Sequence, residues 1–220
     1  MSDVDRPGAG AWVPDEPTEA SLREAVQRCR GCELYADATQ AVMGRGPSGA
    51  RLMVLGEQPG DREDQAGEPF VGPAGRLLDR ALDEAGIDPA GVYRTNVVKH
   101  FRFSGTRGKQ RIHQSPNQVH VTACGPWLLA ELDVVEPEGV VVLGGTAGKA
   151  LYGSSFRVGE TRGRLQPWPD SIGRVPTGEK RPDWALPTTH PAAVLRSRQR
   201  EQDHELLVRD LAVAAQALAT

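Results

Sequence analysis

Two side chains with complementary acid–base chemistry, Glu57 and His113, stand in short motifs of this chain. Glu57 belongs to Gly56-Glu57-Gln58-Pro59-Gly60, directly after the apolar run 52–55, and His113 ends the segment 109–113, Lys-Gln-Arg-Ile-His. A carboxylate at the end of a strand and a histidine on a basic loop suit an enzyme that attacks a substrate attached to a polyanion. From position alone, the sequence favours a different role for His113, that of a loop histidine that contacts phosphate.

Three further residues have useful chemistry and an ordinary alternative. Phe70 lies on a glycine-bounded loop, where it would stack on a flat ring or fill the core. Asn96, at a strand end, offers a donor and an acceptor, although asparagine there is often a turn former. His190 precedes Pro191, a pair that is weak evidence by itself.

The three cysteines suggest a metal centre. Cys29 and Cys32 form a Cys-x-x-Cys pair, and Cys124 is the one other cysteine. His100 is the best fourth candidate, because it ends a strand that must return near the helix that carries Cys124. Three thiols and an imidazole suit zinc or an iron–sulfur cluster, and the spacing does not choose between them. A disulfide or buried thiols are the alternatives.

Composition predicts a soluble protein with one core. The chain has 220 residues, 39% of them hydrophobic, and no apolar run approaches the roughly 20 residues of a membrane span. We expect residues 1–17, acidic and rich in Pro and Gly, to be a disordered lead-in, and residues 18–220 to form a single domain. The lead-in lacks the features of a signal peptide, which predicts a cytoplasmic location.

Charge is unevenly distributed along the chain. The net charge is −3, but residues 89–130 contain no Asp or Glu and carry +6 from Lys and Arg, so the rest carries −9. This local basic segment favours binding to nucleic acid, and a solvated basic face is the alternative. The expected phosphate contacts are Arg102, Arg107, Lys109 and Arg111.

Short β-branched runs alternate with helical segments, which predicts an α/β fold: a parallel sheet with helices on both faces. The expected strands are 52–55, 93–98, 140–143 and 185–188, and the expected helices 18–28, 74–85, 115–132 and 199–218. Ser115 is the expected N-cap of the third helix, and 159–182 a long surface connection. The loops 56–73, 99–115 and 189–197 follow strands, so they should meet at the carboxyl edge of the sheet.

These motifs together resemble the uracil-DNA glycosylase superfamily, specifically its iron–sulfur branch, family 4. The resemblance covers roughly residues 29–200 and includes 56–60, Pro69-Phe70-Val71-Gly72-Pro73, Thr95-Asn96-Val97-Val98-Lys99 and His190-Pro191. Within the branch, Gln58, His100 and the Lys-Gln-Arg-Ile-His segment are most similar to UdgX, the DNA-crosslinking group. The chain departs from that group at Gln110, where Arg is usual, and at Ala192 and Ala193, where serines are usual.

The resemblance implies a three-layer α/β/α fold with a central four-stranded parallel sheet. It implies a structural 4Fe–4S cluster held by Cys29, Cys32, His100 and Cys124, with zinc as the alternative. It also implies that uracil, in DNA that is preferably single-stranded, is contacted by Phe70, Asn96, Gln58 and a pocket-wall Glu63.

In the activity that the resemblance implies, His190 stabilises the departing uracil, and His113, assisted by Glu57, attacks the sugar to give a covalent enzyme–DNA product. No obligate protein partner is inferred. A hydrolytic family-4 enzyme, a metal-stabilised nucleic-acid-binding module and a small electron carrier remain as alternatives.

Overall fold

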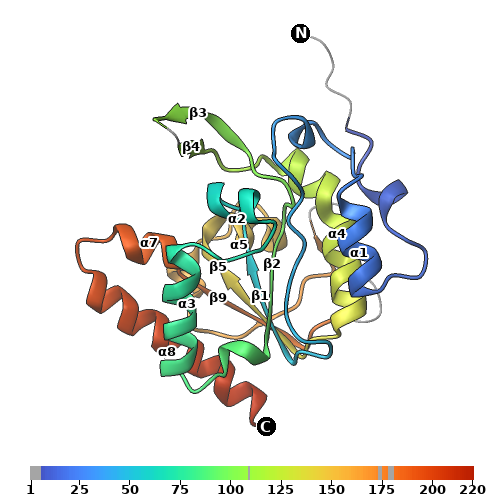
Figure 1. Ribbon diagram of the computed structural model, residues 1–220. Helices are drawn as coiled ribbons and strands as arrows, with labels where there is room; N and C mark the ends of the chain where they lie inside the picture. The colour runs from blue at the N-terminus through green and yellow to red at the C-terminus, as the bar shows by residue number, and fades with distance from the viewer. Residues whose placement is uncertain (1–5, 109, 173–174, 178–180) are drawn as a thin grey trace.

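The central sheet contains four parallel strands. In the computed structural model, which describes residues 6–108, 110–172, 175–177 and 181–220, they are ordered β2 (Val92–Asn96), β1 (Leu52–Gly56), β5 (Gly139–Leu143) and β9 (Trp184–Thr188) (Figure 1). The short strand β6 (Gln166–Pro167) pairs antiparallel with β9 and extends one edge. The predicted four-stranded parallel sheet is therefore confirmed, with one added edge strand.

Helices cover both faces of this sheet, which gives the predicted three layers (Figure 1). One face packs against α1 (Glu19–Val26), α4 (Gln118–Val135) and α5 (Gly144–Tyr152). The other packs against α3 (Pro73–Glu84), α7 (Pro191–Arg196) and α8 (Arg200–Leu218). The shorter elements are α2 (Asp61–Ala66), α6 (Val158–Thr161), and the 3-10 helices η1 (Gly10–Trp12), η2 (Glu33–Ala36) and η3 (Pro89–Gly91).

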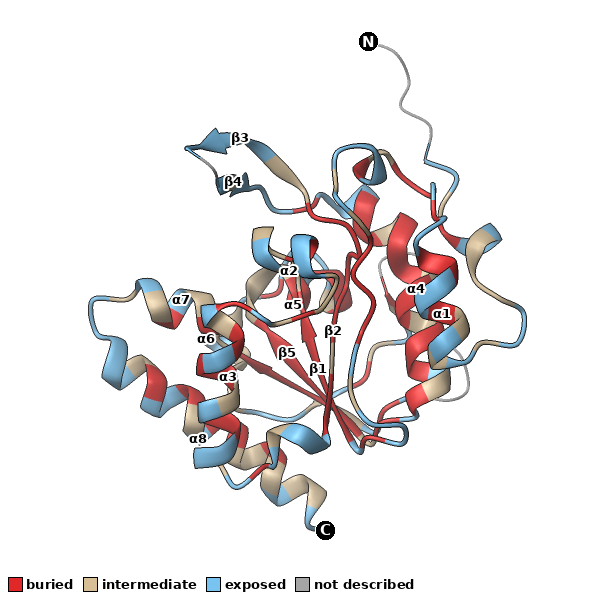
Figure 2. Ribbon diagram, in the orientation of Figure 1, coloured by how far each residue is buried: buried red, intermediate tan, exposed pale blue. Residues whose placement is uncertain are grey.

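The alternation of side chains along β1 produces two separate apolar cores. Met53 and Leu55 point into the core under α1 and α4, whereas Leu52 and Val54 point into the core under α3 and α8. All five residues of β1 are buried, as expected for a central parallel strand covered on both faces (Figure 2). The apolar run 52–55 thus forms the centre of the molecule.

The N-caps of α1 and α4 are Thr18 and Asn117, two residue types that often cap helices. Thr18, the first residue of the helix expected over 18–28, is the N-cap of α1, and its hydroxyl accepts a hydrogen bond from the backbone N–H of Ser21 at 3.1 Å. The Ser115 prediction is wrong, because the N-cap of α4 is Asn117. The backbone N–H of Asn117 donates to Nδ1 of His120 at 2.9 Å, and this bond selects the second of two suitable capping residues.

Residues 99–115, predicted as a loop, contain a β-hairpin. Strands β3 (Phe103–Arg107) and β4 (Gln110–His113) pair antiparallel and project from the body of the molecule beside α2 (Figures 1 and 2). Gly105 and Gly108 adopt positive φ within it, a conformation that favours glycine. The connection predicted over 159–182 also contains structure, namely α6, β6 and the pair β7 (Ser171–Ile172) and β8 (Val175–Pro176), with Ile172 and Trp168 buried.

Residues 6–13 differ from the disordered lead-in that composition suggests. The backbone N–H groups of Gly8 and Ala9 donate to the carbonyls of Gly31 and Ala123 at 3.0 and 2.7 Å. Ala9 is buried, and Arg6 forms an ion pair with Glu33. The segment therefore packs against the polypeptide around two of the predicted metal ligands.

The helices of the structure can be compared with the length and composition of a membrane-spanning helix. Among the residues that the structure describes, no helix combines the length and apolar character that crossing a bilayer requires. The cytoplasmic location stays a prediction.

Candidate active site

The carboxyl ends of three strands meet at one edge of the sheet and position the predicted site residues. Glu57 directly follows β1, Asn96 is the last residue of β2, and His190 lies two residues beyond β9. Phe70 comes from the loop between α2 and α3, and His113 is the last residue of β4 (Figure 1). This edge is where ligands bind in open parallel sheets.

Glu57 and His113 face one another. Nε2 of His113 lies 3.6 Å from Oε1 of Glu57. This distance is longer than the range of about 2.7–3.2 Å for a normal hydrogen bond. This Glu57 oxygen is buried and has no hydrogen-bond partner among the described residues. The side chain of His113 is 47% exposed, whereas that of Glu57 is 18% exposed. A sheltered carboxylate therefore lies beside an imidazole that a ligand can reach.

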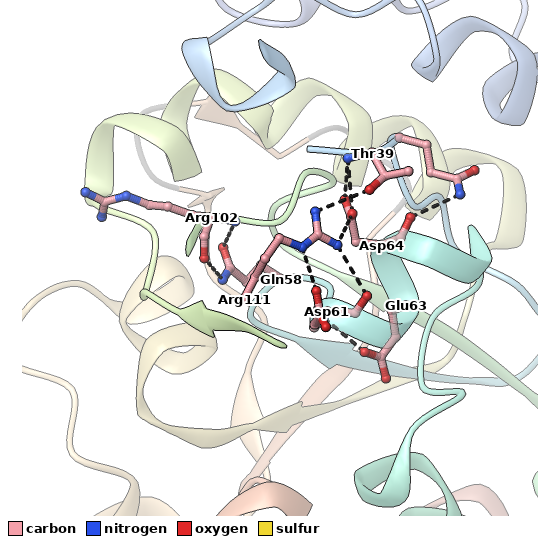
Figure 3. Close-up of polar contacts among 9 residues, drawn as sticks. Thr39, Gln58, Asp61, Glu63, Asp64, Arg102 and Arg111 are labelled. Carbon is pink, nitrogen blue, oxygen red and sulfur yellow. Dashed lines mark hydrogen bonds and ion pairs between the residues drawn. The ribbon is translucent and has the colours of Figure 1, made fainter. Parts of the chain in front are cut away.

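The stem of the β3–β4 hairpin is held by Gln58 (Figure 3). Nε2 of Gln58 donates to the carbonyls of Arg102 and Gln114 at 3.0 and 3.1 Å, and its Oε1 accepts from the N–H of Arg102 at 3.1 Å. Because both polar atoms of the side chain are engaged, the prediction that Gln58 contacts the substrate is not supported. The residue joins the Glu57 motif to the hairpin that carries His113.

Arg111 anchors the same hairpin to α2 (Figure 3). Its Nε donates to Oδ1 of Asp61 and its Nη2 to Oδ2 of Asp64, both at 2.6 Å, and Nη1 reaches Oγ1 of Thr39 at 3.2 Å. The guanidinium also lies over the ring of Phe101 at 5.2 Å. With its donors engaged by these residues and only 16% of the side chain exposed, Arg111 is a structural anchor, and these contacts do not support the predicted contact with phosphate.

The other predicted phosphate contacts differ in how far their side chains are engaged within the protein. Arg102 donates to the carbonyl of Ser115 and to Oδ1 of Asn117 at 2.6 and 3.0 Å, so part of its guanidinium is occupied. Arg107 is exposed on the hairpin. Lys109 lies outside the described residues. Arg107 is thus the best placed of the described candidates for a phosphate contact.

Asn96 and Phe70 lie close together at the end of β1. A Cβ added to Gly56 would clash with Oδ1 of Asn96 and touch the Phe70 ring at 3.0 Å. Asn96 is buried, yet its amide has no hydrogen-bond partner among the described residues. The amide atoms are not among the fully shielded polar atoms that lack a partner, so they reach the surface, where their donor and acceptor are available to a ligand.

Phe70 is held in an unfavourable backbone conformation. Its φ is +59°, in the left-handed region that a bulky residue rarely adopts. Gly75 permits this geometry, because a Cβ at that position would clash with the carbonyl of Phe70. Strain of this kind is found preferentially at functional sites, and here it keeps the aromatic ring beside Asn96.

Glu63 supports the pocket from behind. Its two carboxylate oxygens accept hydrogen bonds from the backbone N–H groups of Gly60 and Gly72, each at 3.1 Å. The side chain thereby ties the Glu57 motif to the loop that carries Phe70. Glu63 was predicted as a pocket wall, and in the structure its observed contacts are with the loops that build that wall.

His190 is a neutral hydrogen-bond donor at neutral pH. Burial, with the nearby charges of Arg196 and His113, lowers its pKa to about 4. Its Nδ1 accepts from the backbone N–H of Ala192 at 3.1 Å, so the ring proton lies on Nε2. Gly144, with a φ of +85°, lies so close that an added Cβ would be 3.0 Å from Cβ of His190.

The predicted metal ligands are buried and share one region, but they do not form a ready single-ion site. Sγ of Cys29 accepts from the N–H of Gly31 and from Nε1 of Trp127, and Sγ of Cys124 accepts from the N–H of Lys99, at 3.3 to 3.4 Å. Among the described residues, no three His, Cys, Asp or Glu side chains are arranged to hold one metal ion. All three cysteines are free, so the disulfide alternative is not found.

The protonation of these groups suits metal binding. Burial raises the pKa of Cys32 to about 11 and that of Cys124 to about 12, and it lowers the pKa of His100 to about 4. The thiols are therefore neutral at pH 7 until a metal displaces their protons, while the imidazole is already in its ligating form. The chemistry of the donor set fits a cluster or a zinc ion.

Comparison with known proteins decides the family. The model of the uracil DNA glycosylase superfamily matches residues 43–212. This chain belongs to the uracil-DNA glycosylase superfamily. It is 35% identical over 181 residues to the type-4 uracil-DNA glycosylase of Thermotoga maritima, with 82% of this chain and 84% of the relative covered. The type-4 enzyme of Pyrobaculum aerophilum is 34% identical, with 80% and 83% covered, and that of Sulfurisphaera tokodaii 33% identical, with 79% and 74% covered.

The superfamily and type-4 assignments confirm the family resemblance in the sequence. The sequence did not reveal the residues that position the hairpin of this glycosylase, above all Asp61 and Asp64. Their spacing of three on a short helix puts both carboxylates on one side, where they meet a single guanidinium. That spacing was a usable signal, although their partner lies about fifty residues further along the chain.

Replacing Arg111 should destabilise the protein. Arg111→Leu leaves Asp64, whose side chain is fully buried, without its cation, and we expect a loss of about 3 kcal/mol in the free energy of unfolding. Arg107→Leu on the same hairpin is the matched control, with a change within about 0.5 kcal/mol. Urea titration measures both variants, and equal stabilities would show that the Arg111 anchor contributes nothing.

His190 should make stability depend on pH. Its folded pKa of about 4 lies below the ordinary value of 6.5, so the unfolded chain binds the proton first and stability falls as the pH drops from 6.5 toward 4. Across this pH interval, we expect the free energy of unfolding of His190→Gln to fall by about 2 kcal/mol less than that of the parent protein. Urea titrations at a series of pH values give the two curves, and parallel curves would contradict the buried neutral state.

Proposed function

We propose that this protein excises uracil from DNA and that His113 then becomes covalently attached to C1′ of the sugar. Membership of the superfamily and the type-4 relatives support excision. The observation that carries the covalent step is the exposed imidazole of His113 beside the partnerless Glu57 oxygen. The similarity to the UdgX group remains part of this proposal.

Recognition of the base begins with extrusion of the nucleotide into the pocket. The ring of Phe70 stacks on uracil, and the Asn96 amide donates to O4 and accepts from N3–H. Nε2–H of His190 donates to O2, where negative charge builds as the glycosidic bond breaks. Single-stranded DNA is the preferred substrate in this proposal, because no base pair must be opened first.

The covalent step needs one ring nitrogen without a proton. The C1′–N1 bond breaks with its electron pair on uracil, and the lone pair of the imidazole forms the new bond to C1′. In the described rotamer Nε2 faces Glu57, which leaves Nδ1 for attack, and a half-turn of the ring exchanges the two nitrogens. Glu57 accepts the remaining ring proton, and the neutral alkylated imidazole is a poor leaving group.

DNA is held by a small number of cationic contacts. Arg107 is exposed on the hairpin and Arg102 retains part of its guanidinium, and we propose Lys109 as a third contact on the basis of its sequence position. Binding should accordingly weaken as salt rises. These contacts fix the register of the strand without reading its sequence.

We propose that Cys29, Cys32, His100 and Cys124 hold a 4Fe–4S cluster that stabilises the fold. In such a cluster each ligand binds a different iron, so the four side chains need not converge on one point as zinc ligands must. The absence of a single-ion arrangement among the described residues favours the cluster over zinc. The N–H donors to the sulfur atoms of Cys29 and Cys124 support the same assignment.

The crosslinking proposal is tested on a denaturing gel. The protein mixed with single-stranded DNA containing one uracil should give a shifted band that survives heat and detergent, and His113→Ala should remove that band. Gln114→Ala, which alters an exposed neighbour without removing its carbonyl, is the matched control. Abasic DNA without a shifted band would support a hydrolytic enzyme, and unchanged DNA a binding module. A band that persists in His113→Ala would identify another nucleophile.

The metal proposal is tested by elemental analysis. The purified protein should be brown and contain about four iron and four sulfide per chain, and Cys124→Ser should lose both. His100→Cys is the matched control, because a fourth thiolate should retain the cluster. One zinc per chain in a colourless protein would contradict the cluster.

A further inference from the structure

A fully buried ion pair lies directly behind Asn96. Nζ of Lys99 is 2.5 Å from Oε2 of Glu131, and neither side chain has any exposed surface. The pair joins the segment after β2 to α4. Removing two charges from water costs several kcal/mol, and apolar residues of similar volume are often as stable. Stability alone therefore gives little reason for this pair.

The ammonium of Lys99 uses all three of its donors. Besides Glu131, it donates to Oγ1 of Thr95 at 2.8 Å and to the backbone carbonyl of Asn96 at 2.6 Å. Hydrogen bonds from a charged donor are stronger than neutral ones. The carbonyl of the residue proposed to read the base is thus held by a buried cation.

Glu131 in turn holds Lys99 in place. Its Oε1 accepts from the N–H of Gly44 at 2.7 Å and from the hydroxyl of Tyr93 at 3.2 Å, and Thr95 donates to both oxygens. The carboxylate is therefore satisfied from several elements at once. A network in which every member is bonded is rigid, so the position of the ammonium is well defined.

The backbone that follows Asn96 is anchored at three successive residues. The N–H groups of Val97 and Val98 donate to the carbonyls of Gly56 and Glu57, each at 3.0 Å. The N–H of Lys99 donates to Sγ of Cys124, and its carbonyl accepts from Val42. The carbonyl of Asn96, just before these anchors, accepts its hydrogen bond from the Lys99 side chain.

We propose that Lys99 is a positioning residue that acts through Asn96 to set the orientation of the base-reading amide. The inference rests on the proposed function. Gly56 leaves the Asn96 amide no spare room, because even a Cβ there would clash with Oδ1. Uracil and cytosine present opposite donor and acceptor patterns, so a tilt of the amide weakens both uracil excision and the discrimination against cytosine.

The test is a double-mutant cycle in single-turnover excision. Lys99→Met with Glu131→Gln removes both charges at similar volume and keeps an acceptor for Gly44. We expect this pair to lower the maximal excision rate constant, measured with protein in excess, by about 10–100-fold. In an Asn96→Ala background the same two changes should alter that constant less than about twofold, because the residue through which they act is gone.

Tyr93→Phe is the matched control. It removes one hydrogen bond to the same carboxylate but leaves all three bonds of Lys99 in place. It should lower the melting temperature and leave the excision rate constant unchanged. Lys99→Leu with Glu131→Gln, which also removes both charges, is run through the same cycle if the first pair of substitutions does not fold.

The two proposals fail in different ways. A parent protein that does not excise uracil removes the proposed function. A parent that excises uracil, with variants that match its rate constant or that lose the same factor with and without Asn96, overturns the positioning role alone. A merely structural role for Lys99 predicts that second result.

Discussion

The arrangement of the site depends on how a small hairpin is tied to the sheet. A two-stranded hairpin is at best marginally stable by itself, and β3–β4 projects from the body of the molecule. Gln58 holds its stem through three hydrogen bonds, and Arg111 holds its second strand through two aspartates of α2. These contacts place His113 against Glu57, and without them the distance between these two side chains would be undefined.

The site combines groups of very different exposure, and that difference assigns their roles. His190 is kept neutral by burial, so in the proposed mechanism it donates a hydrogen bond to a developing anion without adding a positive charge of its own. His113 is half exposed, so incoming DNA reaches it. Between them, Asn96 and Phe70 form a wall made possible by two glycines, Gly56 and Gly75. The proposed roles of the two histidines, His190 as donor and His113 as nucleophile, thus follow from their different surroundings.

Sequence reasoning succeeded where a residue's neighbours along the chain decide its position. Glu57, Asn96 and His190 follow or end apolar runs, and parallel strands bring such positions to one edge. It did not predict the hydrogen-bond partners of Gln58 and Arg111, because those partners are distant in sequence. Arg111 looks like a phosphate contact until Asp61 and Asp64 are placed beside it. The hairpin was missed for a related reason, since its strands are exposed and lack the alternation that marks a half-buried strand.

Gln110 stands where arginine is usual in the UdgX group, and its place in the hairpin decides which contacts of the site this difference can affect. Gln110 is exposed, is the first residue of β4 and pairs with Arg107 across the hairpin. Successive residues of a strand point to opposite faces, so Gln110 and Arg111 project in opposite directions. The Arg111 anchor and the distance between His113 and Glu57 are therefore independent of the residue at 110. An arginine there would add a charge on the face opposite the anchor, beside Arg107. In the proposed function, glutamine at this position therefore weakens the attraction for DNA and leaves His113 in place.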